Sequence, residues 1–513
     1  MKVNRSTLLP AFLLLSILQS AAQKKYHVLS VPAIDAYTHI DPKGKTVLPS
    51  GRYITAAGTT ILITHDPTGM AISPDGAKTV TLHNGVFTII DNATMEATRV
   101  PSYDGHIASP LSNGSFLGVA FSGDSKTIYL SGGDNGAVIV YDISSFKRID
   151  SISLNGKIDS VDYEDSFTSD LLLNETNHEL LVLDRGNFRL VRIDLSTKKI
   201  TASIKTGRQP FGLSISPDKR IAFVANVGMY DYPILADVTE KNHNPNLLPF
   251  QPYGNGTNKS IGGYTWHRRK IPGVGSPLAS ESMSVYSIDL STNQVIDKFK
   301  TGHQIGQMVE GAEVVGGASP NSIAVGTRYA YVTNATNDNI SVIDYREHRI
   351  VDHISIKTDT LIDHYRGLLP FGITLSKDEK TLYVALLGFN AIAVIDAEKK
   401  TTMGLIPTGW GAARVQLSRD EKQIYLASCR GYGAGPNGGK DFVSPVQGTY
   451  IGDIELGSFQ KIQMPDSQQL SAYTKQAIEN TFITMNVGDD GKNPLAPLPK
   501  IRKSPIKYLV YIT

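Results

Sequence analysis

Short apolar runs alternate with polar turns along most of the chain. Runs such as Phe87–Ile90, Val138–Val140 and Ile340–Ile343 have the length of β-strands. The turns between such runs contain Pro-Asp-Gly, Lys-Asp-Glu and Asn-Asp-Asn, which favour tight chain reversals. This pattern predicts an all-β protein built from many short strands.

A longer unit repeats through the chain. The unit begins with Gly or Pro and a strand that ends in Ser. A turn with Asp and Lys follows, and then a strand with Tyr and Val. The last strand of the unit ends in Asp. The closing residues are Asp91, Asp142, Asp194, Asp289, Asp344, Asp396 and Asp453. They recur about every 50 residues, the period of a propeller blade, with roughly 40 additional residues in the fourth unit. The pattern therefore predicts a seven-bladed β-propeller whose fourth blade carries an insertion at residues 229–281.

The repeat and its flanks define the expected domains. The propeller is expected to occupy residues 23–455, with the strand-like segment Thr46–Ile61 completing the ring beside the last blade. Residues 456–503 are expected to form a helix, Ser467–Asn480 with Asp466 as N-cap, and then a linker that begins at Asn486. Residues 504–513 are expected to form an extended tail.

The first 22 residues have the pattern of a signal peptide. Lys2 and Arg5 precede an apolar stretch from Leu8 to Leu18, and small residues stand before Gln23. A membrane anchor is the alternative, but the apolar stretch is too short to span a bilayer. We expect cleavage between Ala22 and Gln23 and a secreted or periplasmic protein.

Charge and cysteine content narrow the possible partners. The chain has 50 Lys and Arg against 48 Asp and Glu, and loss of the signal peptide removes two of the basic residues. A balanced chain has no electrostatic reason to bind nucleic acid or an anionic membrane. Cys429 is the single cysteine, so no intrachain disulfide can support the fold, and we expect a small buried side chain there.

One repeat carries a known signature. Tyr331-Val332-Thr333-Asn334 spells the motif of the YVTN-type β-propeller family, and looser copies occur at Leu382-Tyr383-Val384-Ala385 and elsewhere. The chain therefore resembles that family over roughly residues 60–455, a WD40-like repeat architecture. The resemblance implies the fold but leaves the function open, because propellers include lactonases, haem enzymes and binding modules.

The last ten residues carry a second resemblance. Ser504–Thr513 is similar to the first strand of the phosphoesterase domain of the alkaline phosphatase superfamily, which follows a YVTN-like propeller in one bacterial two-domain family. The segment Ile271–Pro277 also looks like that family's insertion. The resemblance implies the N-terminal part of such a protein, ending before the metal-binding residues of the hydrolase. An ordinary terminal strand is the alternative.

No catalytic or metal-binding motif stands out, and two places are candidates for binding. The connections that enter the innermost strands should meet at the mouth of the channel, where several Arg would suit a small anion such as a carboxylate, phosphate or sugar acid. The candidate residues there are Arg208, Gln209, Arg366, Trp410, Arg414 and Arg430. The second place is the insertion, where aromatic and basic side chains resemble a recognition surface. Its candidate residues are Tyr264, Trp266, His267 and Arg268.

These observations favour an exported binding or scaffolding propeller that is not catalytic by itself and needs no cofactor. Its partner would be a phosphoesterase domain or another protein, with a small anionic ligand also possible. The alternative is a lactonase-like hydrolase acting at the channel, which would need an acid or base beside a polar pocket. A haem or copper protein is disfavoured because its histidine ligands would be clustered, whereas here they are scattered.

Overall fold

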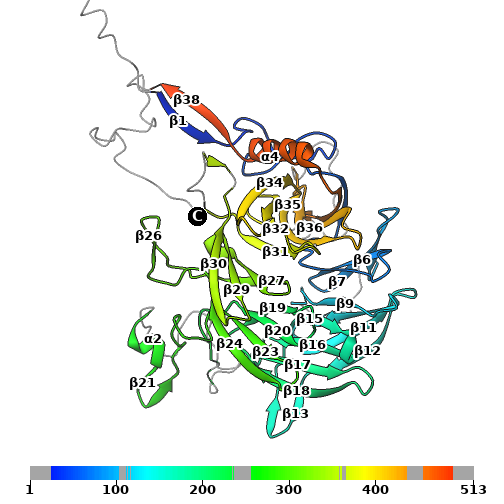
Figure 1. The fold of residues 1–513 in the computed structure, drawn as a ribbon, viewed down its shortest axis with the longest axis vertical. Coiled ribbons are helices and arrows are strands. Elements are labelled where there is room, and N and C mark those ends of the chain that lie inside the picture. The colour runs from blue at the N-terminus through cyan, green and yellow to red at the C-terminus, as the bar shows by residue number, and fades with distance from the viewer. Residues whose placement is uncertain are drawn as a thin grey trace, which may run out of the picture.

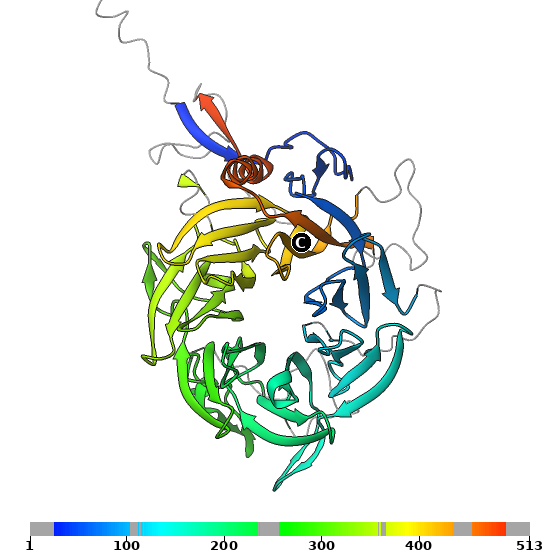
Figure 2. The ribbon, with the colours of Figure 1, turned by 45° about the vertical axis from the view of Figure 1, so that its right-hand side comes forward.

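The computed structural model describes residues 25–102, 111, 114, 115, 117–233, 235, 256–357, 359, 360, 366–435 and 454–488. Seven four-stranded antiparallel sheets stand around a common axis and form a ring (Figure 2). The prediction of an all-β, seven-bladed propeller is therefore confirmed. The described part of the chain includes two short helices, α2 (Asn258–Gly262) and α4 (Ser467–Thr481).

The first four blades follow the chain in order from the innermost to the outermost strand. Blade 1 contains β5 (Gly69–Ile72), β6 (Lys78–His83), β7 (Val86–Asp91) and β8 (Ala97–Val100). Blade 2 contains β9 (Val119–Phe121), β10 (Thr127–Ser131), β11 (Ala137–Asp142) and β12 (Lys147–Ser153). Blade 3 contains β15 (Thr168–Asn174), β16 (Glu179–Asp184), β17 (Arg189–Asp194) and β18 (Lys199–Lys205). Blade 4 contains β19 (Pro210–Ile215), β20 (Ile221–Asn226), β23 (Ser284–Asp289) and β24 (Gln294–Lys300).

The last three blades complete the ring. Blade 5 contains β27 (Pro320–Val325), β28 (Tyr329–Asn334), β29 (Asn339–Asp344) and β30 (Arg349–Ser355). Blade 6 contains β31 (Pro370–Leu375), β32 (Thr381–Leu386), β33 (Ala391–Asp396) and β34 (Thr401–Pro407). Blade 7 contains β35 (Trp410–Leu417), β36 (Gln423–Gly431), β37 (Gly457–Gln463) and, as its outermost strand, β4 (Thr59–Ile63). In blades 1 to 6 the third strand ends on the aspartate that marks the repeat.

The ring closes through a strand from the N-terminal side of the chain. β4 pairs antiparallel with β37, so that Ile63 lies opposite Gly457 and Thr59 lies opposite Lys461. This pairing links the two ends of the propeller and covers the edge of the last blade. The blade extends beyond residue 455, where the sequence placed its end, because the third strand follows the long connection that starts after β36. Asp453 itself lies outside the described residues.

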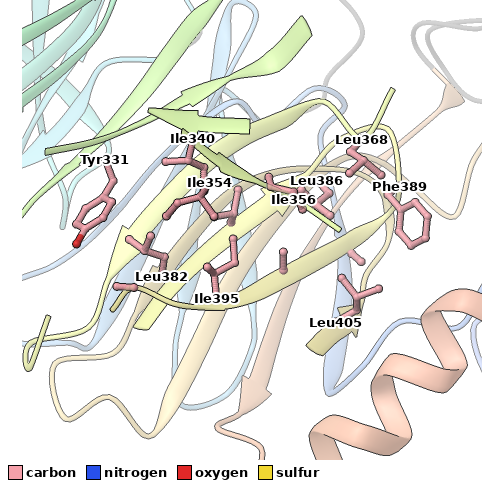
Figure 3. Close-up of a cluster of buried hydrophobic side chains, with 14 of the residues drawn as sticks. Tyr331, Ile340, Ile354, Ile356, Leu368, Leu382, Leu386, Phe389, Ile395 and Leu405 are labelled. Atoms are coloured by element: carbon pink, nitrogen blue, oxygen red, sulfur yellow. The ribbon is translucent and has the colours of Figure 1, made fainter. Parts of the chain in front are cut away.

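Apolar side chains fill the space between neighbouring blades. In Figure 3, Tyr331 and Ile340 of blade 5 face Leu382 and Ile395 of blade 6, and these side chains are at most 5% exposed. Each sheet thus buries both of its faces against its neighbours, which is the reason why a single blade would not be stable alone.

The chain leaves the ring through helix α4. Asp466 caps the helix by accepting a 2.8 Å hydrogen bond from the Gln469 amide, as the sequence predicts. The helix packs on β34, where Gly404 leaves room for Leu470. Beyond it, β38 (Ile483–Gly488) pairs antiparallel with β1 (Lys25–Ser30) and forms a two-stranded ribbon beside the propeller (Figure 1). The first residues of the expected linker therefore belong to a strand, and its remainder, the tail at 504–513 and the expected signal peptide lie outside the described residues.

The two faces of the ring differ in their connections. One face carries the short turns between the first and second strands of each blade and between the third and fourth strands of blades 1 to 6, and we call it the turn face. The other carries the second-to-third connections and the links between blades, and we call it the loop face. Hairpins extend from the loop face: β13 (Gly156–Ile158) with β14 (Val161–Tyr163), β21 (Tyr264–Trp266) with β22 (Arg269–Ile271), and β25 (Met308–Val309) with β26 (Ala312–Glu313). A further hairpin, β2 (Thr46–Val47) with β3 (Tyr53–Ile54), precedes β4.

No helix in the described ranges is long and apolar enough to cross a membrane.

Candidate functional site

The axis of the ring is formed by the seven innermost strands, each of which starts at the loop face. At one equivalent position near that end, four blades carry glycine: Gly69, Gly118, Gly212 and Gly372. At Gly212 a side chain would collide with the neighbouring strand, since a Cβ there would lie 2.0 Å from the carbonyl oxygen of Asn321. The other three blades carry Asp170, Ser322 and Arg414 at this position. At this level the axis therefore carries one carboxyl, one hydroxyl and one guanidinium group, and the other four positions are glycine.

Arg414 of blade 7 spans the axis. Its Nε atom donates a 2.7 Å hydrogen bond to the carbonyl oxygen of Thr68, which precedes blade 1, and its Nη1 atom donates a 3.1 Å bond to Oγ of Ser322 in blade 5. The guanidinium carbon also lies 5.9 Å from the ring centre of Phe371 in blade 6. Blades 5 and 7 are not neighbours, so this side chain closes part of the axis near the loop face.

Asp170 of blade 3 provides the opposite charge. Its Oδ2 atom accepts a 2.9 Å hydrogen bond from the amide of Leu213, and its Oδ1 atom accepts one of 3.0 Å from the amide of Leu171. Burial raises the pKa of the Asp170 carboxyl, and the positive charge of Arg414 opposes that rise. Burial likewise lowers the pKa of Arg414. The charges of the two side chains therefore interact across the axis.

Aromatic rings narrow the same region. The rings of Phe211 in blade 4 and Phe371 in blade 6 meet edge to face, with centres 6.0 Å apart. In the described part of the chain, no group of three or more His, Cys, Asp or Glu side chains is placed to hold a metal ion. The arrangement can hold a small polar group against a carboxyl and a guanidinium, or it can close the axis.

The side chains expected at the channel mouth lie in five different surroundings. Arg414 lies on the axis, as described above. Arg208 and Gln209 lie together before β19, but the Arg208 side chain points into the insertion while Oε1 of Gln209 accepts a 2.5 Å hydrogen bond from Nε of Arg185. Arg366 forms an ion pair with Glu310 of the β25–β26 hairpin. The structure does not bring these side chains into one binding site.

Trp410 and Arg430 form a pair of their own. The Arg430 guanidinium carbon lies 5.6 Å from the Trp410 ring centre, and the same guanidinium forms an ion pair with Glu455. Trp410 packs beside Leu48 and Tyr432, so the pair joins the segment before β4 to blade 7. These contacts support the closure of the ring.

Sequence reasoning missed Asp170, Ser322, Phe211 and Phe371. A signal for them was present in the repeat: where other copies of the innermost strand have glycine, two copies have a charged residue. Aligning the seven innermost strands by this position would have identified Asp170 and Arg414 together.

The four residues expected in the insertion lie on one hairpin. Tyr264 and Trp266 belong to β21, and His267 and Arg268 form its turn with left-handed φ values of 45° and 66°. Tyr264 pairs with Ile271, which is 1% exposed, so the aromatic face of the hairpin turns inward and both aromatic rings are partly buried. His267 and Arg268 are exposed at the tip.

The outer side of this hairpin is strongly basic. Lys259, Arg268 and Lys270 are exposed, and Arg269 is partly buried. No Asp or Glu occurs between residues 256 and 280. In a chain with almost balanced charge, such a segment presents a local positive surface to a partner.

Two cations hold the insertion on the ring. Arg208 is 7% exposed, and its Nη1 atom donates 2.9 Å hydrogen bonds to the carbonyl oxygens of Met229 and Ser276. Its Nη2 atom pairs with Glu281 at 3.0 Å. Lys300 of β24 donates to the carbonyl oxygens of Pro277 and Ser282, and burial, followed by the charge of Arg208, lowers the pKa of Lys300 to about 8. The base of the insertion is therefore fixed to blade 4.

Comparisons with known proteins assign no family to this chain. No family model matches the sequence, and no curated protein matches it. Among solved structures, the chain is similar to hydrazine synthase of Kuenenia stuttgartiensis, with 16% sequence identity and a TM-score of 0.46. The alignment covers 72% of this chain and 95% of that chain.

Proposed function

We propose that this chain is an exported binding or scaffolding propeller and the N-terminal part of a phosphoesterase-type protein, without catalytic activity of its own. The fold is consistent with a binding or scaffolding role. Export, the YVTN-type family and the phosphoesterase partner are inferred from the sequence patterns described above.

One observation carries the proposal: the fourth blade presents a basic hairpin on a rigid base. Arg208 and Lys300 fix the base of the insertion, while Arg268 and Lys270 at its far end are exposed. In Figure 1, α2 and β21 extend from the ring beside β23 and β24. A positive surface held in one position on a neutral ring is suited to docking an acidic region of a partner domain.

The nucleotide sequence after codon 513 provides the first test. We expect it to encode a phosphoesterase-type domain, and that domain, produced separately, should bind the propeller. Changing Arg268→Glu together with Lys270→Glu should weaken binding at least about tenfold, because the hairpin charge is reversed. The matched control changes Lys147→Glu and Lys199→Glu on the turn face and should leave binding unchanged.

Two results would contradict the proposal. An unrelated gene directly after codon 513 would remove the basis for a phosphoesterase partner. Equal binding by the hairpin variant and the turn-face control would show that the basic hairpin is not the docking surface.

A lactonase-like hydrolase is the second candidate, and the observation that favours it is the place of the Asp170 carboxyl on the axis, where the amides of Leu171 and Leu213 hold it. A carboxyl fixed in this way could act as the acid or base in the ring opening of a lactone. The test is hydrolysis of a panel of lactones by the full chain and by Asp170→Asn. Activity that Asp170→Asn abolishes, while the melting temperature stays unchanged, would favour this candidate over the binding propeller.

A further inference from the structure

A cleft with a volume of 430 Å³ lies at the junction of blades 3 and 4, next to the base of the insertion. Its lining includes Phe188, Lys205, Tyr286, Val295 and Lys298, together with the ion pair of Arg208 and Glu281. The volume falls within the range of small-molecule sites. The cleft is separate from the axis and from the tip of the basic hairpin.

The charges of the cleft favour an anion. Lys205 and Lys298 are exposed, and within the described part of the chain neither ammonium group pairs with a carboxylate. Arg208 and Glu281 neutralise each other, so Asp231 is the one lining carboxylate that opposes the two lysines. The net charge of the lining residues is therefore positive, whereas the charges of the whole chain are almost balanced.

The remaining walls suit a ligand that combines an oxyanion with a carbon skeleton. Tyr286 is 3% exposed and lies beneath Lys298, whose Nζ atom is 5.2 Å from the centre of the Tyr286 ring. Burial, followed by the charge of Glu281, raises the pKa of Tyr286 to about 12, so its hydroxyl remains a hydrogen-bond donor at neutral pH. Phe188 and Val295 provide apolar surface. Lysines and a tyrosine hydroxyl are donors that bind the oxygens of a phosphate.

We propose that this cleft binds a small phosphate monoester, with Lys205 and Lys298 holding the phosphate group and the apolar wall of Phe188 and Val295 holding the organic part. The proposal gives the proposed binding propeller a ligand, but it depends neither on the phosphoesterase domain nor on the basic hairpin.

Isothermal titration calorimetry of the full chain tests this site with glucose 1-phosphate, inorganic phosphate and glucose. Glucose 1-phosphate should bind most tightly, inorganic phosphate more weakly, and glucose should not bind. Changing Lys205→Ala together with Lys298→Ala should weaken binding of glucose 1-phosphate at least about tenfold, because two charged donors are lost. Changing Tyr286→Phe should weaken it less.

The control variant carries Lys147→Ala and Lys199→Ala, two exposed lysines of the turn face that carry the same total charge. It should bind glucose 1-phosphate like the wild type. Equal loss of affinity in both lysine variants would show a general charge effect and would overturn the proposal, as would no binding of glucose 1-phosphate at millimolar concentration. Tighter binding of inorganic phosphate than of glucose 1-phosphate would also overturn it, because the apolar wall would then have no role.

The failure of this site can be told apart from failure of the proposed function. A propeller that binds the separately produced domain but not glucose 1-phosphate would contradict the ligand site alone. Binding of glucose 1-phosphate without binding of the domain would contradict the proposed partner alone.

Discussion

The turn face and the loop face of this propeller are held together in different ways. On the turn face, five blades repeat one small cap, in which a serine hydroxyl donates to the aspartate two residues later and accepts from a backbone amide at the start of the second strand. The pairs are Ser73–Asp75, Ser122–Asp124, Ser216–Asp218, Ser376–Asp378 and Ser418–Asp420, with oxygen–oxygen distances of 2.5 to 2.7 Å. On the loop face, the amides of Asn226 and Asn334 make a similar contact in two blades by donating to the hydroxyls of Ser284 and Ser341, and single buried side chains hold much of the remainder.

Arg189 is the clearest of these single anchors. Its Nε atom lies 2.7 Å from Oδ2 of Asp184, and its Nη2 atom donates to the carbonyl oxygen of Leu154. The guanidinium carbon lies 3.5 Å from the centre of the Tyr163 ring, so the same side chain holds the β13–β14 hairpin. Losing one contact on the turn face leaves four similar ones in place, whereas losing Arg189 removes several contacts at once. We therefore expect a few substitutions on the loop face to reduce stability strongly, and many substitutions on the turn face to reduce it by small, additive amounts.

Arg189→Ala should have the largest effect. It leaves Asp184, which is 0% exposed, without its charge partner, and removal of one member of a buried pair costs roughly 3–5 kcal/mol of unfolding free energy. Urea unfolding followed by circular dichroism measures the change. The control is Arg349→Ala, whose ion pair with Glu347 is exposed and should contribute less than about 1 kcal/mol. Similar losses of unfolding free energy in the two variants would contradict the proposed difference between the two faces.

Arg208→Ala should have a smaller and more local effect. The variant loses the hydrogen bonds to Met229 and Ser276, so the base of the insertion should open more easily, by roughly 1.5–3 kcal/mol. Hydrogen exchange should then be faster at the amides of residues 256–283, with little change in the melting temperature of the ring. Arg268→Ala at the exposed tip is the matched control. Unchanged exchange in Arg208→Ala would show that this arginine does not anchor the insertion.

The same contrast explains what the sequence could predict. The turn face is periodic, and its closing aspartates predict the number of blades and the position of the insertion. The loop face depends on contacts between distant residues, such as Arg208 with Ser276, and no local pattern encodes them. An arginine before an innermost strand therefore looks the same in the sequence whether it binds a ligand, as the sequence predicted for Arg208, or anchors a loop, as the structure shows for Arg208.

The axis shows a further reason for incomplete prediction. Asp170 and Arg414 belong to blades 3 and 7, and only closure of the ring brings their charges together. Repeat alignment can identify them as exceptions to glycine, but the coupling follows from the curvature of the whole ring.

Ser216→Ala should cost about 1 kcal/mol, the contribution of one ordinary hydrogen-bonded cap. Oγ of Ser216 accepts a 3.0 Å hydrogen bond from the amide of Ile221, and this bond is lost in the variant. The double variant with Ser73→Ala should lose the sum of the two single effects, because the caps are in separate blades. Chemical unfolding measures all three variants, and Ser196→Ala, on an exposed serine, serves as control. A double loss well above the sum would mean that the caps of the turn face are coupled and not independent.

The smallest effect concerns the pH dependence of the unfolding free energy at the turn that follows the third strand of blade 2. Hydrogen bonds from the hydroxyls of Ser144 and then Ser145, and from the Ser145 amide, lower the pKa of Asp142 to about 2 from an ordinary value of 3.8. A carboxyl whose folded pKa is lowered stabilises the fold above its unfolded pKa, and this contribution disappears as the pH falls through the folded pKa. The difference in unfolding free energy between the wild type and Asp142→Asn should therefore be greatest at neutral pH and shrink as the pH falls from about 4 to about 2. Asp159→Asn, at an exposed position in the turn of the β13–β14 hairpin on the loop face, serves as the control for the loss of one carboxyl group. A difference for Asp142→Asn that stays constant with pH would show that the shape of the side chain, and not its charge, holds the turn.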